Sequence, residues 1–223
     1  MAQKDFVIAT MPGDGIGEDI INAATSIVDL SSDIIGGYKC NWDLIKAGAT
    51  YFALTGKDVE PGGEEKADTS DSIFLGAIGL PTIRHSDGTE ICPHLRFREV
   101  FNLYAGVRPV KAYPNITNRL SNDLSSKIDL VILRESTEGL FYSAAVHNRC
   151  PVDNNEEVQD IMRITRTTTE KLHDFAFNLA RQRKNKGKLG KVTCVDKANV
   201  FRSQAFFRKI FDERKQNFLD ITS

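Results

Sequence analysis

The sequence has no strong excess of charge, no long apolar run and no paired cysteines. Its 223 residues hold 29 lysines and arginines against 30 aspartates and glutamates, a net charge of −1. This balance gives no global field that would attract nucleic acid or an anionic membrane. No apolar run approaches the length that spans a bilayer, and "MAQKDFVIAT" lacks the apolar core of a secretion signal. We therefore expect a cytoplasmic protein without nucleic-acid or membrane partners.

Cysteine and histidine are too few and too scattered to build a metal site. The four cysteines contain no C-x-x-C pair, and two of them fall in expected strands. That pattern fits buried thiols in a reducing compartment and not a disulfide framework. The four histidines show no metal-ligand spacing, and we predict a surface position for His173 on an expected helix. The sequence thus predicts no metal site in this chain.

Strand patterns and helix patterns alternate along the chain. The expected strands cover residues 5–10, 39–48, 72–79, 107–114, 128–133 and 191–196. The expected helices cover 18–32, 50–54, 94–106, 199–215 and a segment that follows a T-x-x-E capping box at 167–170. The basic run 181–191 is expected to close that last helix, with Gly187 in the C′ turn. The alternation predicts an α/β fold with a substantial parallel sheet.

The motif "GDGIG", from Gly13 to Gly17, lies between an expected strand and an expected helix. Backbone N–H groups in that setting can face a phosphate. The spacing is G-x-G-x-G, however, and no G-K-[ST] follows. A tight turn that needs positive φ explains the glycines equally well, so both interpretations stay open.

Three arginines and a lysine are the main candidates for a ligand site. Arg98 lies on an expected helix, Arg108 begins the next strand, and Arg134 ends the strand "IDLVIL", where α/β sheets bind ligands. Because a guanidinium binds a carboxylate bidentately, converging arginines would suit a di- or tricarboxylate. Lys197 also follows an expected strand, and a partly desolvated amine there could act as a base. Each of the four could instead be an ordinary surface residue.

Four segments together resemble one known family. "PGDGIGED", "LRFREVFNLYAGVRPVKAYP", "DLVILRESTEGLFYS" and "VTCVDKANVFRSQAFFRKIF" appear in the order and spacing of the decarboxylating 3-hydroxy-acid dehydrogenases, which include isopropylmalate, isocitrate and tartrate dehydrogenases. The resemblance implies two α/β domains around a mixed, largely parallel sheet, with the C-terminal part of the family fold absent. Residues 1–103 would be the N-terminal part of the larger, cofactor-binding domain. Residues 104–223 would be most of the smaller substrate and dimerisation domain.

The resemblance also implies a role for each candidate residue. Substrate binding would fall to Arg98, Arg108, Arg134 and His94, and catalysis to Lys197, which in the family reaches the active site of the neighbouring subunit. Contacts with NAD or NADP would come from Ile16, Glu90 and Asn199. The family needs Mg²⁺ or Mn²⁺, whose ligands would lie in the part that is absent here. A homodimer with shared active sites would bind a small hydroxy diacid.

Three departures from the family pattern affect this interpretation. Family members run well past Ser223, and we favour a truncated gene or an incomplete sequence, with the short chain inactive by itself. A non-catalytic regulatory or binding subunit is the alternative. Phe141 occupies the position of the catalytic tyrosine, and Tyr142 would face away if the segment were a regular strand. Cys92 and His94 replace the serine and asparagine of isocitrate enzymes, which favours a diacid such as tartrate or malate over isocitrate.

Overall fold

The computed structural model describes residues 3–116, 120, 123–145 and 149–223, and it divides into two compact units. Unit 1 is Met1–Phe97 and unit 2 is Arg98–Ser223. The division falls inside helix α4, Pro93–Val100, slightly earlier than the domain limit expected from the sequence. The cofactor-binding and substrate-binding roles of the two parts stay predictions. None of the helices in the described residues is long and apolar enough to cross a membrane.

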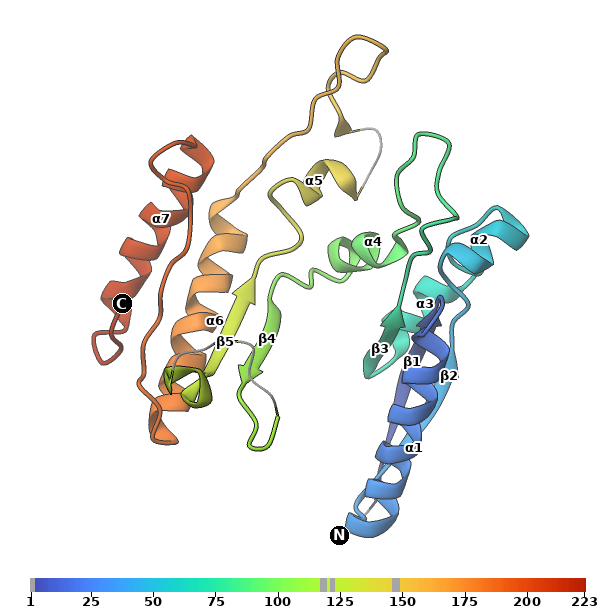
Figure 1. Cartoon of the computed structure of the whole chain (residues 1–223), viewed down its shortest axis with the longest axis horizontal. Helices are drawn as coiled ribbons and strands as arrows, with labels where there is room; N and C mark the ends of the chain where they lie inside the picture. Colours follow the sequence, from blue (N-terminus) through green and yellow to red (C-terminus); the bar gives the residue numbers. More distant parts are fainter. Residues whose placement is uncertain (1–2, 117–119, 121–122, 146–148) are drawn as a thin grey trace. The chain divides into compact units, whose positions relative to one another are not determined.

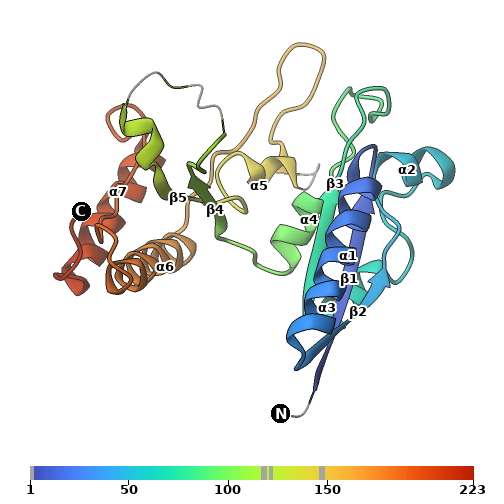
Figure 2. The same cartoon turned by 60° about the horizontal axis from the view of Figure 1, so that its bottom comes forward.

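Unit 1 is built on a parallel three-stranded sheet (Figure 1). The strands β1 (Lys4–Gly13), β2 (Tyr38–Leu44) and β3 (Ser72–Ala77) run in the order β2-β1-β3. Helix α1, Gly17–Ile35, runs along this sheet in Figure 2, with Ile21 buried against it. The short helices α2 (Ala49–Thr55) and α3 (Gly63–Thr69) follow β2.

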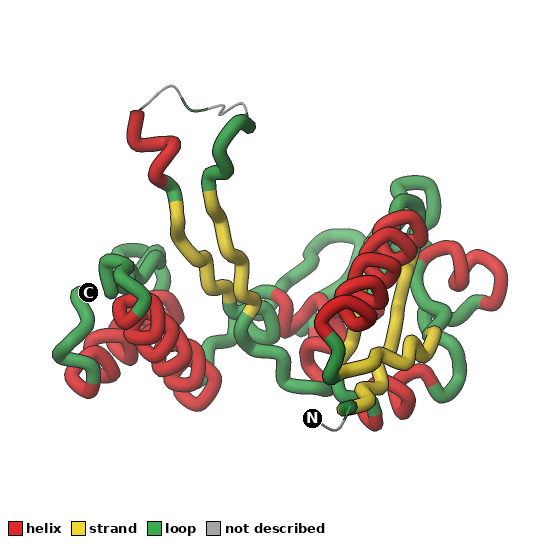
Figure 3. The backbone as a smooth tube through the Cα atoms, turned by 90° about the horizontal axis from the view of Figure 1, so that it is seen from below, coloured by secondary structure: helices red, strands yellow, loops and turns green. Residues whose placement is uncertain are grey.

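Unit 2 contains an antiparallel strand pair and two packed helices. Strand β4, Gly106–Lys111, pairs with β5, Asp129–Arg134, and Figure 3 shows the two side by side in yellow. The long helices α6 (Arg166–Asn185) and α7 (Arg202–Arg214) pack together. The aromatic rings of Phe177, Phe211 and Phe218 stack in their shared core. The described part of unit 2 also contains the short helix α5 (Phe141–Ala144) and the 3₁₀ turns η1 (Asp123–Lys127) and η3 (Lys215–Asn217).

The mixed α/β architecture with a parallel sheet is confirmed, while three local predictions are wrong. Residues 191–196 form no strand, although they alternate between exposed and half-buried, because only Lys191 bridges to another described residue, Thr222. The N-cap of α6 is Thr165, two residues before the predicted capping box. His173 is only 4% exposed, because it lies edge-on to Phe207 and Phe211 between α6 and α7.

Candidate active site

Arg108 and Arg134 lie on the same face of the β4–β5 pair. The register places Arg108 opposite Ile132 and Gly106 opposite Arg134. Directly opposite residues in antiparallel strands share a face, and so do residues two apart along one strand. The two arginines are therefore diagonal neighbours, with Cβ atoms about 7 Å apart in the usual geometry. Both side chains are exposed, so their guanidinium groups can approach one dicarboxylate together.

The side chain of Arg134 is held in place by its own loop. Its Nε donates a hydrogen bond to Oγ of Ser136 at 3.0 Å, and Ser136 is buried. Its guanidinium lies over the Phe141 ring, 5.5 Å from the centroid. Across the strand pair, a Cβ at Gly106 would come within 3.1 Å of the Arg134 carbonyl oxygen. A side chain at position 106 would therefore crowd the backbone of Arg134, which glycine avoids.

Phe141 and Tyr142 lie at the start of helix α5 and not on a strand. The alternation of side chains along a strand therefore does not decide where their rings face. The Tyr142 ring lies between two other cations, with the guanidinium of Arg149 4.4 Å from its centroid and that of Arg163 4.8 Å away. Arg149 also donates to the carbonyl oxygen of Tyr142 at 3.2 Å and pairs with Glu99. Phe141 is thus the aromatic ring beside Arg134.

The two glutamates of "RESTEG" have structural roles that sequence reasoning missed. Glu135 accepts hydrogen bonds from the backbone amides of Thr137 at 2.7 Å and Glu138 at 2.8 Å. Glu138 accepts from the amide of Thr165 at 2.7 Å and from its hydroxyl. Because Thr165 is the N-cap of α6, Glu138 connects the Arg134 loop to that helix. Because Glu138 and Thr165 are 27 residues apart, no local sequence pattern predicts this contact.

His94 and Arg98 both lie on helix α4, and both are half-buried. The carbonyl oxygen of Arg98 accepts a hydrogen bond from the amide of Leu103 at 2.8 Å, which closes the end of the helix. Their proposed contacts with substrate stay predictions.

Lys197 and Asn199 lie in the turn that precedes α7, and both side chains are exposed. The carbonyl oxygen of Lys197 accepts hydrogen bonds from the amides of Val200 at 3.0 Å and Phe201 at 3.1 Å. The amine is therefore carried on a hydrogen-bonded turn, and no strand leads directly into it.

The "GDGIG" turn is organised around the carboxylate of Asp14. Asp14 is 3% exposed and accepts hydrogen bonds from the backbone amides of Ala49, Thr50 and Gly79 at 2.7–2.8 Å. Burial alone would raise its pKa, but these amides outweigh burial and the pKa is lowered. The amide of Asp14 itself donates to Ala77, and that of Gly17 donates to Asp14. These amides are already used, and a buried carboxylate repels phosphate, so the tight-turn interpretation fits the structure.

The glycines of this turn confirm that interpretation. Gly13 and Gly15 have φ values of 78° and 55°, in the left-handed region. A Cβ at Gly13 would lie 2.0 Å from the Ala77 carbonyl oxygen. Ile16, an expected cofactor contact, is exposed at the start of α1, and Glu90, the second, pairs with Arg84 at 3.2 Å.

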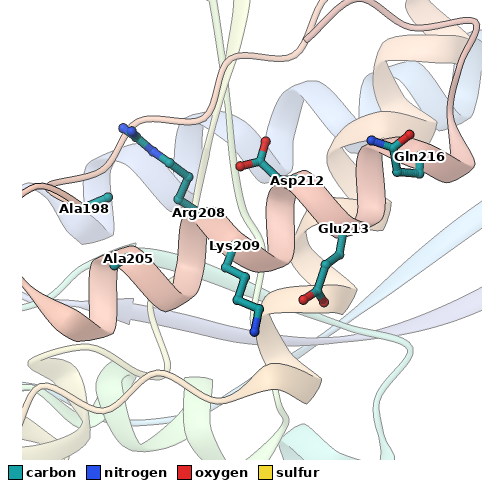
Figure 4. A pocket seen from close by; sticks show the side chains of 7 residues that line it. All are labelled: Ala198, Ala205, Arg208, Lys209, Asp212, Glu213 and Gln216. Atoms are coloured by element: carbon teal, nitrogen blue, oxygen red, sulfur yellow. The ribbon is translucent and has the colours of Figure 1, made fainter.

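The described residues include an open hollow along α7 but no candidate metal cluster. No group of three or more His, Cys, Asp or Glu side chains among them could hold a metal ion. An open hollow of about 580 Å³ lies along α7, and Figure 4 shows Arg208, Lys209, Asp212 and Glu213 projecting around it. Of the Lys197 turn, only Ala198 lines this hollow, and none of the predicted site residues does so.

Comparison with known proteins gives one consistent family. The family model described as isocitrate/isopropylmalate dehydrogenase matches residues 7–223. The chain is 33% identical over 215 residues to a 3-isopropylmalate/3-methylmalate dehydrogenase of Methanocaldococcus jannaschii and 32% identical over 219 residues to a 3-isopropylmalate dehydrogenase of Heyndrickxia coagulans. These alignments cover 96% of this chain but only 58% and 57% of the relatives.

A solved structure agrees with these matches. The isocitrate dehydrogenase of Methylococcus capsulatus superposes with a TM-score of 0.77 at 27% identity, over 97% of this chain and 59% of that one. The chain thus spans somewhat more than half the length of its relatives. On the sequence match and the shared fold, it belongs to the isocitrate/isopropylmalate dehydrogenase family of decarboxylating hydroxy-acid dehydrogenases.

Proposed function

We propose that this chain supplies the carboxylate-binding and lysine-bearing part of an NAD(P)-dependent dehydrogenase that oxidises, and decarboxylates, a small 2-hydroxy diacid. The observation that supports it most is the diagonal placement of Arg108 and Arg134 on one face of the β4–β5 pair. Two exposed arginines whose Cβ atoms are about 7 Å apart can direct both guanidinium groups at one short diacid. Arg98 would add a third cation to the same substrate.

The remaining roles follow from family membership. Lys197 would move a proton at the reacting hydroxyl, in a homodimer where each subunit completes the other's site. Asn199 and Ile16 are exposed and suited to contacts with a nicotinamide nucleotide, which would accept the hydride. The described residues do not by themselves fit a divalent cation, so we assign none of them to Mg²⁺ or Mn²⁺.

The substrate itself is proposed from two substitutions. Cys92 and His94 stand where isocitrate enzymes have a serine and an asparagine, so an extra carboxylate would lose its usual hydrogen-bond donors. A diacid of the malate, tartrate or isopropylmalate type is therefore our first choice, with isocitrate as the alternative.

A non-catalytic binding or regulatory role is a second candidate. Phe141 lies beside Arg134, at the position of the family's acid, and its ring has no proton to give. A chain of this kind could bind the diacid through its arginines without turning it over.

Both candidates can be tested on the product of the natural gene. We would purify it with Mn²⁺ and follow reduced cofactor with NAD or NADP and a panel of malate, tartrate, isopropylmalate and isocitrate. Turnover of a diacid, with KM raised about 100-fold in Arg134→Gln through loss of a charge-assisted pair, is the expected result. Diacid binding by calorimetry without turnover would favour the regulatory role. If the protein neither bound nor turned over any of these acids, the proposal would be overturned.

A further inference from the structure

The residue before Lys197 has a fully buried carboxylate. The side chain of Asp196 is 0% exposed, although the turn around it faces solvent. Its Oδ1 accepts hydrogen bonds from the amide of Ala198 and from Nη2 of Arg208, both at 2.8 Å. Its Oδ2 accepts from Nε of Arg208 at 2.9 Å and from Sγ of Cys194 at 3.4 Å. Both oxygens are thus occupied, and Arg208 binds them bidentately.

The surroundings of Asp196 and Cys194 determine which of the two carries a proton. Burial alone would raise the pKa of Asp196, but Arg208, the Ala198 amide and Cys194 outweigh it, so the pKa is lowered. Burial and the nearby Asp196 raise the pKa of the Cys194 thiol to about 12, which keeps its proton available for donation. Asp196 is therefore a carboxylate with a fixed orientation at neutral pH.

Arg208 connects this carboxylate to a firmly packed helix. It projects from the middle of α7 toward the segment that carries Ala198 (Figure 4). The next turn of α7 is anchored in the core of unit 2 by Ile210 and Phe211, and Arg214 pairs bidentately with Asp174 of α6. The ion pair therefore transmits the position of α7 to the turn.

Further hydrogen bonds, within the turn and to α7, hold the turn as well. The carbonyl oxygen of Lys197 accepts from two following amides, and its own amide donates to Oε1 of Gln204 at 3.5 Å. Every one of these contacts engages backbone or a neighbouring side chain, which leaves the Lys197 amine exposed at the surface of a braced turn.

We propose that Asp196 and Arg208 are positioning residues, whose ion pair fixes the turn so that Lys197 and Asn199 leave it in one direction. Neither residue touches the reacting atoms; each acts through the backbone of the turn. The inference rests on the proposed function for the role of Lys197, and it adds two residues to that site.

The positioning can be measured on the 223-residue chain, without any activity. Trypsin cuts the Lys197–Ala198 bond only after the turn opens locally. We expect Asp196→Asn and Arg208→Gln to raise the cutting rate about tenfold, since each removes a charge-assisted hydrogen bond. The Lys188–Leu189 bond, in a loop where Leu189 is 91% exposed, is the internal reference. Lys209→Gln, the neighbour on α7, is the matched control and should leave the rate unchanged.

The Arg208→Gln variant decides the test even if Asp196→Asn fails to fold. Its side chain is 54% exposed, so the chain should fold even if Asp196→Asn does not. An unchanged ratio of the two cutting rates in Arg208→Gln would overturn the inference. Partial protection in Arg208→Lys, which retains one charged donor, would support it further.

Kinetics on the natural gene product separate this inference from the proposed function. Arg208→Gln should lower kcat about tenfold and leave the KM for the diacid within about twofold, since the β4–β5 arginines do not contact the turn. Lys209→Gln should change neither. Turnover with kcat unaffected by Arg208→Gln would overturn the inference and leave the proposed function standing. No turnover in wild type would overturn the proposed function, and the trypsin ratio would still decide the positioning.

Discussion

Two buried aspartates organise two turns in this molecule, and they do so by different means. Asp14 in unit 1 accepts three backbone amides, from Ala49, Thr50 and Gly79. Asp196 in unit 2 accepts one backbone amide and a bidentate arginine. Each turn lies beside a predicted site residue, Ile16 in the first case and Lys197 in the second.

The two aspartates differ in whether their donors belong to the main chain or to side chains. Backbone amides are fixed by the fold, so no side-chain substitution elsewhere can remove the donors around Asp14. Besides one backbone amide, the donors to Asp196 are the side chains of Arg208 and Cys194, so replacing Arg208 should change the turn while the helix behind it remains. The turn beside the sheet of unit 1 is thus held by main-chain donors, and the turn that carries Lys197 is held largely by a side chain.

The largest loss of stability is expected for Asp14→Ala, which tests the role of the main-chain donors. Three backbone N–H groups, one buried and two part-buried, would lose their acceptor, which costs about 3 kcal/mol of unfolding free energy. Urea denaturation of wild type and the variant measures the loss of unfolding free energy. Asp33→Ala, at an exposed position of α1, is the matched control and should stay within about 0.5 kcal/mol of wild type. An equal loss in both variants would contradict the role of Asp14.

A pH series should separate the two units by their buried titratable groups. Burial lowers the pKa of His173 to about 4, and neither ring nitrogen has a hydrogen-bond partner among the described residues. The unfolded chain takes up this proton near pH 6.5 and the folded chain only near pH 4, so stability falls as the pH drops between them. The pKa of Asp14 is lowered instead, so its contribution is lost only below about pH 3.8.

The measurement is the free energy of unfolding at pH 7 and pH 5. We expect wild type to lose about 2 kcal/mol more than His173→Leu over this interval. The carboxylates of Asp129 and Asp220, whose pKa values are lowered to about 2 by their basic partners, titrate below it. The same loss in wild type and His173→Leu would show that His173 is not the group responsible.

The sequence predicts the helices and the parallel sheet of this fold well, because apolar periodicity reports burial within one element. It fails where the outcome depends on another element. Residues 191–196 have the alternation of a strand, but no described strand lies alongside them. His173 is polar by type, and only the packing of α7 against α6 buries it.

In the candidate site too, the sequence marks some residues, while other contacts are visible only in the structure. The resemblance marks Arg108 and Arg134, and the register of β4 and β5 then explains how they can act together. Asp196 and Arg208 are twelve residues apart, and no local pattern predicts that they meet. Likewise, Phe141 and Tyr142 lie at the start of helix α5, so the alternation of side chains along a strand does not decide where their rings face.

A smaller effect is expected for Phe141→Tyr in the natural gene product. The new hydroxyl would stand on the ring that lies beneath Arg134, where the family has its acid. A positioned general acid commonly contributes far more, but a newly placed one should raise decarboxylation relative to oxidation by about tenfold at most, or about 1.4 kcal/mol. The ratio of CO₂ released to cofactor reduced measures it. A fall in that ratio would show that phenylalanine is required at position 141.

The smallest effect is expected for Tyr142→Phe. The tyrosine ring lies between Arg149 and Arg163, and phenylalanine would preserve both contacts because they involve the ring face. Stability should change by less than about 0.5 kcal/mol, and the ratio of CO₂ to reduced cofactor should not change. If decarboxylation were lost while hydride transfer continued, the Tyr142 hydroxyl would be the acid after all. The two aromatic rings of α5 would then have exchanged the roles that their arginine partners indicate, Phe141 beside Arg134 and Tyr142 beside the Arg149–Glu99 pair.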